Sequence, residues 1–294
     1  MDLRSSRVIP INGIQLGYED HGAPDAPPLV LLMGNGCGSS FWPDPFVDLL
    51  VRGGRRVIRF DYRDTGRSSH VDFEKAPYGL DDLEKDVLGL LAHLGIGKAH
   101  LVGLSMGGFL AQQLAIRHPQ AVASLISMMS TPDYAVMLHA FMGGEPPTSG
   151  LPPPRQEWFE ALSRLPKELP PLEMAVENWR LANGSRSPFD PEDWRALHRI
   201  AAQRGDDALA GEHHRRACER SSSKNQLRAL EGVTVPCLFI QGSEDPIFPP
   251  AHAEASARAV PGGRLLLIEG MGHALNSHFF EPLTHAILEH TRPD

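Results

Sequence analysis

The chain has 294 residues, of which 41% are hydrophobic and 22% are charged, so most of it is expected to fold around a sizeable core rather than remain disordered. Its formal net charge is −8, and no long run of Lys and Arg occurs, which argues against a nucleic-acid-binding protein. A short basic run extends from His213 to Arg216, but Glu212 and Glu219 lie close to it. We interpret this run as the solvated face of a helix.

The cysteines and the apolar runs narrow the class of protein further. Cys37, Cys218 and Cys237 are odd in number and form no C-x-x-C pair, so neither a disulfide framework nor a zinc knuckle is expected. The first residues contain no apolar stretch typical of a signal peptide, and no run approaches the length of a membrane span. We therefore expect a cytoplasmic protein that does not bind membranes, and nothing in the sequence indicates an oligomeric state.

Short apolar runs bounded by turn residues predict six strands. They cover residues 29–33, 57–60, 100–104, 125–129, 237–241 and 265–268. Continuous apolar residues, as at 29–33, are typical of strands covered on both faces in a parallel sheet. Helical periodicity appears between them, at 80–94 and at 109–115. Alternating strands and helices predict an α/β protein with a doubly wound, mostly parallel sheet.

This alternation stops between the strand at 125–129 and the strand at 237–241. The intervening stretch is rich in Pro and Gly and contains Trp158, Trp179 and Trp194 among helix-forming residues. We predict a helical cap over residues 132–231, inserted into a core domain formed by residues 1–131 and 232–294. The cap is expected to line an apolar pocket with Phe141, Trp158, Phe159 and Trp179, or to bury them in a core of its own.

Residues 103–107 read Gly-Leu-Ser-Met-Gly and match the pattern G-x-S-x-G. In this pattern a sharp turn between a strand and a helix strains the serine backbone and exposes its hydroxyl, and the glycines prevent collisions. A predicted strand precedes Ser105 and helix-forming residues follow it. We predict that Ser105 is a nucleophile and that the N–H of Met106, at the helix N-terminus, stabilises an oxyanion.

A serine nucleophile needs a base, and the base needs an acid that orients it. His273 follows the predicted strand 265–268, and Asp245 follows the strand 237–241, which gives the chain order Ser, Asp, His. Glu244 is adjacent but is expected to point the other way, and Asp133 is an alternative acid. The remaining histidines have ordinary places at helix ends or on helices, among them His93, His118, His252, His285 and His290.

The loop after the first predicted strand contains Gly34, Gly36 and Gly38. We predict that the N–H of Asn35 in this loop is the second oxyanion donor. A nucleotide site is an alternative, because the loop is rich in glycine and Asp61 ends the next strand as a ribose-binding acid would. The loop lacks the G-x-G-x-x-G spacing, however, and the sequence contains no phosphate-binding G-x-x-x-x-G-K-[ST] motif.

Together these motifs resemble the α/β-hydrolase superfamily, and within it the aclacinomycin methylesterase-like esterases. The resemblance rests on Met33-Gly34, Phe41-Trp42-Pro43, and the stretches 61–68 (DYRDTGRS), 77–79, 103–107 and 270–275. It implies a triad of Ser105, Asp245 and His273, and oxyanion donors at Asn35 and Met106. It also implies a cap that selects the substrate and removal of a methyl ester from a bulky polyketide glycoside, without metal or organic cofactor.

Other activities on the same frame remain open. The turn at 103–108 is also similar to that of enol-lactone hydrolases, and perhydrolases and C–C bond hydrolases share the triad. Dehalogenases and epoxide hydrolases are disfavoured, because they carry a carboxylate where this chain has Ser105. A ligand receptor without catalysis is a different class, as is an NAD-dependent oxidoreductase. Phe41 and Trp42 either wall the pocket or pack beneath it.

Overall fold

The computed structural model describes residues 6–144 and 147–292 and contains an eight-stranded sheet in the order β1-β2-β4-β3-β5-β6-β7-β8. β1 and β2 pair antiparallel, as do β2 and β4, and every other neighbouring pair is parallel. The strands are β1 (Arg7–Ile11), β2 (Ile14–His21), β3 (Pro28–Leu32), β4 (Arg56–Phe60), β5 (Ala99–Leu104), β6 (Val122–Met128), β7 (Cys237–Gly242) and β8 (Arg264–Ile268). The doubly wound, mostly parallel sheet is therefore confirmed.

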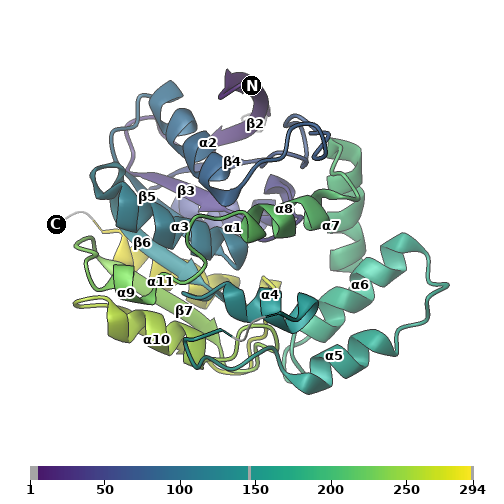
Figure 1. The fold of residues 1–294 in the computed structure, drawn as a ribbon. Coiled ribbons are helices and arrows are strands. Elements are labelled where there is room, and N and C mark those ends of the chain that lie inside the picture. Colours follow the sequence, from purple (N-terminus) through teal and green to yellow (C-terminus); the bar gives the residue numbers. More distant parts are fainter. Residues whose placement is uncertain (1–5, 145–146, 293–294) are drawn as a thin grey trace.

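Helices cover both faces of this sheet (Figure 1). On one face α1 (Asp44–Arg52) packs against α11 (Phe280–His290). On the other, α2 (Leu80–His93) packs against α3 (Met106–Arg117), which contacts β3, β5 and β6, and α10 (Ala251–Ala259) contacts β7 and β8. Because both faces are covered, the central strands are apolar on consecutive residues; β3 is buried from Leu29 to Leu32.

All six predicted strands are present, as β3 to β8, whereas β1 and β2 were not predicted. These two strands form a hairpin whose turn residues, Asn12 and Gly13, have φ values of +47° and +79°. An Asn-Gly pair is the strongest short-range signal for such a hairpin, because both residues tolerate positive φ. The predicted helices at 80–94 and 109–115 correspond to α2 and to the interior of α3.

We call residues 132–231, between β6 and β7, the insertion; its described residues, 132–144 and 147–231, form helices and add no strand to the sheet. Its helices are α4 (Ala135–Met142), α5 (Gln156–Ser163), α6 (Pro171–Ala182), α7 (Pro191–Arg204), α8 (Ala210–Glu219) and α9 (Leu227–Leu230). Figure 1 shows α5, α6 and α7 on one side of the molecule, away from α9 and α10, and α8 beside the lower end of α2. Of the helices within residues 6–144 and 147–292, none has the length and apolar character needed to cross a membrane.

The interpretation of the run 213–216 as a solvated helix face is wrong for its two histidines. On α8, His214 is fully buried and His213 is 8% exposed. His213 Nδ1 lies 3.0 Å from Asp64 Oδ2, and His214 contacts the backbone of Gly36 and Arg63. Charge patterning misled the interpretation because the acids beside these histidines in the chain, Glu212 and Glu219, are not their partners in space.

Candidate active site

Ser105 lies at a sharp turn between β5, which ends at Leu104, and α3, which begins at Met106. Its backbone has φ +56° and ψ −119°, a conformation that residues other than glycine rarely adopt. A Cβ on Gly103 would lie 2.1 Å from the carbonyl oxygen of Gly107, and a Cβ on Gly107 would lie 2.1 Å from that of Leu32. The two glycines of the G-x-S-x-G pattern are therefore sterically required, and the turn presents the hydroxyl of Ser105 at the end of the sheet.

His273 and Asp245 meet at the carboxyl ends of β8 and β7. Nδ1 of His273 lies 2.9 Å from Oδ2 of Asp245, and both side chains are buried. A carboxylate only accepts hydrogen bonds, so this contact assigns the proton to Nδ1 and leaves the lone pair of the ring on Nε2. The neutral imidazole can therefore accept a proton at Nε2.

The carboxylate of Asp245 is fully buried and is held by four donors. Oδ1 accepts the backbone N–H groups of Ile247 at 2.8 Å and Phe248 at 2.9 Å, while Oδ2 accepts Nε2 of Gln241 at 2.8 Å as well as His273. Such donors compensate for the loss of water around a buried negative charge. They also fix the direction in which the carboxylate faces the imidazole.

The alternative acids lie elsewhere in the described structure. Glu244 turns toward the insertion and accepts the N–H and hydroxyl of Ser185 at 2.8 and 3.0 Å. Asp133 accepts the N–H of Ala135 at 3.0 Å and Nδ2 of Asn225 at 3.2 Å. Of the three candidate acids, only Asp245 has a hydrogen bond to His273.

A cavity of about 380 Å³ lies between the carboxyl ends of the strands and the insertion. Ser105, His273 and Asn35 all line it. Its walls are mostly apolar, and they include Met33, Leu104, Tyr134, Met137, Leu138, Phe141, Trp158, Leu162, Trp179, Ala182, Ile247 and Phe248. The nucleophile and the base predicted from the sequence thus face one apolar chamber large enough for a small organic molecule.

The six predicted pocket aromatics divide into two groups. Phe141, Trp158 and Trp179 line the cavity, whereas Phe159 packs beside it against Phe141 and Trp158 with ring centroids 5.1 Å away in each case. Phe41 and Trp42 are both buried outside its walls. Phe41 stacks on Trp179 at 5.9 Å, and Trp42 stacks on Phe46 at 5.7 Å. Phe41 therefore packs behind the lining residue Trp179, whereas Trp42 packs in the core on Phe46.

The loop at 34–38 follows β3, and it is folded back by a hydrogen bond of 3.3 Å from the N–H of Cys37 to the carbonyl oxygen of Gly34. Asn35, at the tip, is exposed to the cavity. Within the described residues, no hydrogen bond engages the backbone N–H of Asn35 or of Met106. Asn35 lines the cavity, whereas Met106 is fully buried and is not among the residues that line it.

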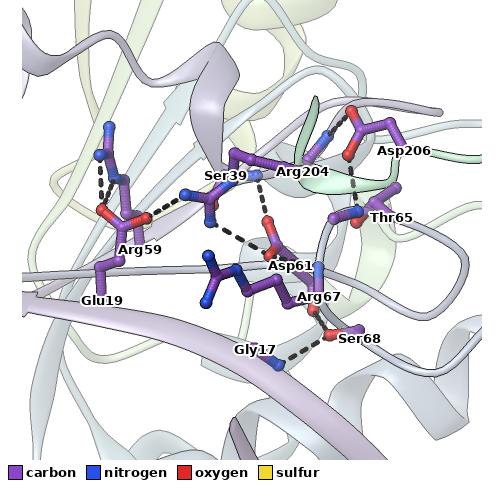
Figure 2. Close-up of polar contacts among 12 residues, drawn as sticks. Gly17, Glu19, Ser39, Arg59, Asp61, Thr65, Arg67, Ser68, Arg204 and Asp206 are labelled. Carbon is purple, nitrogen blue, oxygen red and sulfur yellow. Dashed lines mark hydrogen bonds and ion pairs between the residues drawn. The ribbon is translucent and has the colours of Figure 1, made fainter. Parts of the chain in front are cut away.

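Asp61 is engaged in a buried polar network rather than open to a ribose (Figure 2). Its oxygens accept the N–H of Ser39 at 2.8 Å and of Arg67 at 3.0 Å, and Nη2 of Arg204 lies 3.3 Å away. Asp206 joins the same network by accepting the N–H groups of Gly66 at 2.6 Å and Gly38 at 3.3 Å. Burial raises the pKa of Asp206 to about 6. Asp61 therefore has a structural place, which removes the main support for a nucleotide site.

Ala182 and Arg215 are among the residues of the insertion that reach this site although the sequence did not single them out. The carbonyl oxygen of Ala182, at the end of α6, accepts the backbone N–H of His273 at 2.7 Å. Arg215, on α8, lines the cavity and pairs with Glu219. Neither residue belongs to a recognisable motif. The role of Ala182 depends on a backbone carbonyl, which has no sequence signature. Arg215 lies in a basic run whose sequence is typical of a solvent-exposed helix face. The helical spacing of Arg215 and Glu219 was the available signal for their pairing.

Comparison with known proteins gives concordant results. A family model described as "Alpha/beta hydrolase family" matches residues 29–284. Rhodomycin D methylesterase DnrP from Streptomyces peucetius is 39% identical over 297 residues, and rhodomycin D methylesterase DauP from Streptomyces sp. (strain C5) is 38% identical over 296 residues. Each alignment covers 98% of both proteins. The enol-lactonase from Burkholderia xenovorans LB400 has the same fold, with a TM-score of 0.71 over 97% of this chain and 99% of that one, at 23% identity.

These matches confirm the resemblance that the sequence motifs predicted. The family model spans most of the chain, and the two methylesterases are more than 30% identical to it over nearly its whole length. The chain therefore belongs to the alpha/beta hydrolase family.

Proposed function

We propose that the protein is a serine carboxylic-ester hydrolase that works through an acyl-enzyme. One observation carries this proposal: the strained Ser105 borders the same apolar cavity as His273, whose Nδ1 lies 2.9 Å from Asp245. The similarity to two methylesterases over nearly the whole chain supports ester cleavage as the reaction. The insertion acts in this proposal as the cap of the active site.

In the first half of the reaction, Nε2 of His273 takes the proton of the Ser105 hydroxyl while Oγ attacks the ester carbonyl carbon. Asp245 accepts the Nδ1–H of His273 and stabilises the imidazolium that forms. When the tetrahedral intermediate collapses, His273 gives its proton to the leaving alcohol. Water then enters and attacks the acyl carbon while it loses a proton to His273. When this second intermediate collapses, His273 returns the proton to Oγ of Ser105 and the acid is released.

The oxygen of the attacked carbonyl gains negative charge in each tetrahedral intermediate. The backbone N–H groups of Asn35 and Met106 are the donors that we assign to it, and the N-terminus of α3 adds a favourable dipole. Loss of one such donor typically costs roughly 100- to 1000-fold in rate. The serine, the imidazole and these two amides suffice for the mechanism without a metal or an organic cofactor.

The substrate that we propose is the methyl ester of a bulky, largely apolar carboxylic acid. Two relatives are named rhodomycin D methylesterases, which supports a small alcohol half. The aromatic wall formed by Phe141, Trp158 and Trp179 supports a large apolar acid half, because flat rings offer extensive contact area.

Covalent labelling tests the proposal. A fluorophosphonate probe is expected to attach to Ser105, and Ser105→Ala is expected to abolish both labelling and hydrolysis of p-nitrophenyl esters. Ser130→Ala is the control. Ser130 is a second serine close to the turn, and its hydroxyl donates a hydrogen bond of 2.7 Å to the carbonyl oxygen of Ser105. If the wild-type protein takes no label and cleaves no activated ester, the proposed esterase activity is overturned and a ligand receptor without catalysis becomes the better interpretation.

A substrate panel tests the bond type. Methyl esters with acyl halves of increasing size are compared with longer-chain alkyl esters of the same acids, with enol-lactones, and with diketones that report C–C cleavage. Peracid formation is followed separately with acetate and hydrogen peroxide. We expect the highest kcat/KM for methyl esters of large acids. A higher kcat/KM for a lactone, for peracid formation or for a diketone would assign that activity to the protein instead of ester hydrolysis.

A further inference from the structure

The 34–38 loop is held from outside by two acceptors that belong to the insertion. The N–H of Gly36 donates to Nδ1 of His214 at 3.0 Å, and the N–H of Gly38 donates to the carboxylate of Asp206 at 3.3 Å. Gly36 directly follows Asn35, and Gly36 and Gly38 flank Cys37. The conformation of the loop therefore depends on residues that lie about 170 positions later in the chain.

His214 is built into this contact as a neutral acceptor. Its Nε2 lies 2.8 Å from the carbonyl oxygen of Arg63, which only accepts, so the ring proton is on Nε2 and the lone pair is on Nδ1. The ring is fully buried and makes an edge contact with Tyr62, with centroids 5.6 Å apart. Burial lowers the pKa of His214 below its ordinary value of 6.5, which preserves the acceptor at neutral pH.

The backbones of the loop and of α8 also pack directly against each other. Gly36 has φ +70°, and a Cβ on it would lie 2.8 Å from Cα of Gly211. Two successive peptide planes of the loop are consequently fixed. The plane that contains the N–H of Asn35 also contains the carbonyl of Gly34, which accepts the N–H of Cys37 at 3.3 Å, and the next plane is fixed through Gly36 by His214.

We propose that His214 is a positioning residue for the oxyanion hole: by accepting the N–H of Gly36, it sets the direction in which the N–H of Asn35 points toward the oxyanion. This inference rests on the proposed function, because it assumes that Asn35 donates to a reaction intermediate. His214 touches no reacting atom in this account. It acts on the rate through one hydrogen bond to the loop.

The preceding residue provides a matched control. His213 lies on the same helix and is also buried, and its Nδ1 lies 3.0 Å from Asp64. It has no hydrogen bond to the 34–38 loop among the described residues. A general loss of stability in α8 is expected from a substitution at either histidine, whereas loss of oxyanion alignment is expected only at His214.

The test compares His214→Gln, His214→Asn and His213→Gln in the full chain. Gln places its amide near Nε2 and removes the acceptor from Gly36, whereas the Oδ1 of Asn lies near the position of Nδ1 and retains it. We expect His214→Gln to lower kcat on a p-nitrophenyl ester about 10- to 100-fold with little change in KM, which is less than the loss of a whole oxyanion donor. His214→Asn is expected to recover most of this loss, and His213→Gln to keep nearly the wild-type kcat.

A trifluoromethyl ketone supplies the readout that stability alone would not change. Its adduct with Ser105 carries an oxyanion, so its affinity is expected to fall across the variants in proportion to kcat/KM, while urea unfolding reports stability separately. An unchanged kcat in His214→Gln, or an equal loss in His213→Gln, overturns the role of His214. If His214→Gln does not fold, ¹⁵N NMR of the wild type decides: a protonated Nδ1, or no coupling between Nδ1 and the Gly36 amide, contradicts the proposal. An inactive, unlabelled wild type would instead refute the esterase itself.

Discussion

Nδ1 of His273 lies 2.9 Å from Oδ2 of Asp245, although the two residues are 28 positions apart and follow different strands. The same Oδ2 accepts Nε2 of Gln241 at 2.8 Å, so both neighbours of this oxygen are donors. An amide nitrogen at this position would face two donors instead of accepting from them. The contact therefore defines the tautomer of His273 as well as its orientation.

Asp245→Asn is accordingly expected to lower kcat roughly 10³- to 10⁴-fold, because the Asn amide favours the imidazole tautomer with its proton on Nε2. Steady-state kinetics on an activated ester gives the measurement. Asp133→Asn is the control, since Asp133 pairs with Ala135 and Asn225. If only Asp133→Asn loses activity on this scale, the acid has been assigned to the wrong residue.

Gly107→Ala tests the steric basis of the turn. The added methyl would lie 2.1 Å from the carbonyl oxygen of Leu32, which is backbone and has little room to move. We expect a loss of several kcal/mol in the free energy of unfolding, measured by urea denaturation, together with loss of fluorophosphonate labelling. Gly97→Ala, at a glycine with nothing within 4 Å of its Cβ position, is expected to remain close to wild type. Equal stability of the two variants would contradict this account of the turn.

Much of the fold and of the candidate site could be predicted because the signals are local. Ser105, Asp245 and His273 each follow an apolar strand, and strand ends in a parallel sheet converge on one edge. The contacts of the insertion could not be predicted in this way. His214 and Asp206 interact with Gly36 and Gly38, and such pairings depend on how helices pack rather than on sequence spacing.

The pocket aromatics illustrate the same limit. Phe41 and Trp42 lie just after the 34–38 loop, but their position in the chain did not reveal whether they face the cavity. In the structure Trp179 separates Phe41 from it, and Trp42 packs on Phe46. An aromatic residue in a loop has similar sequence surroundings in both situations, since the outcome depends on which partner ring covers it.

Trp158→Ala tests the wall of the cavity. Trp158 lines the cavity from α5, and its removal is expected to lower kcat/KM for methyl esters of large aromatic acids roughly 10-fold or more, with little effect on small acetate esters. Phe159→Ala, on the same helix but outside the lining, is expected to change both values only slightly. A parallel loss on large and small esters in Trp158→Ala would indicate a structural role for this ring.

Glu19→Gln tests the buried ion pairs that Glu19 forms with Arg59 and with Arg204 of the insertion. Burial alone would raise the pKa of Glu19, but the hydrogen bond with His21 and the charges of Arg59 and Arg204 outweigh it and lower the pKa from 4.5 to about 2. The ionised form is thus favoured in the folded state, so its stabilisation is present above about pH 4.5 and is lost as the pH falls toward 2. The contribution of this pKa shift to the free energy of unfolding has an upper limit of order 3 kcal/mol.

The measurement is urea unfolding of the wild type and Glu19→Gln between neutral pH and about pH 3. Gln cannot ionise and leaves Arg59 and Arg204 short of a counter-charge, so the variant is expected to be less stable at neutral pH. The difference between the two proteins should shrink as the pH falls below about 4.5. A difference that stays constant over this range would contradict the lowered pKa.

The hydrogen bond between Gly36 and His214 also has a consequence for protein engineering within the family. An insertion is commonly regarded as an exchangeable module that selects the substrate while an invariant core performs the chemistry. Here the insertion supplies acceptors to two amides of a core loop. A chimera that receives a foreign insertion would therefore change in turnover as well as in selectivity, unless acceptors for Gly36 and Gly38 are transplanted with it.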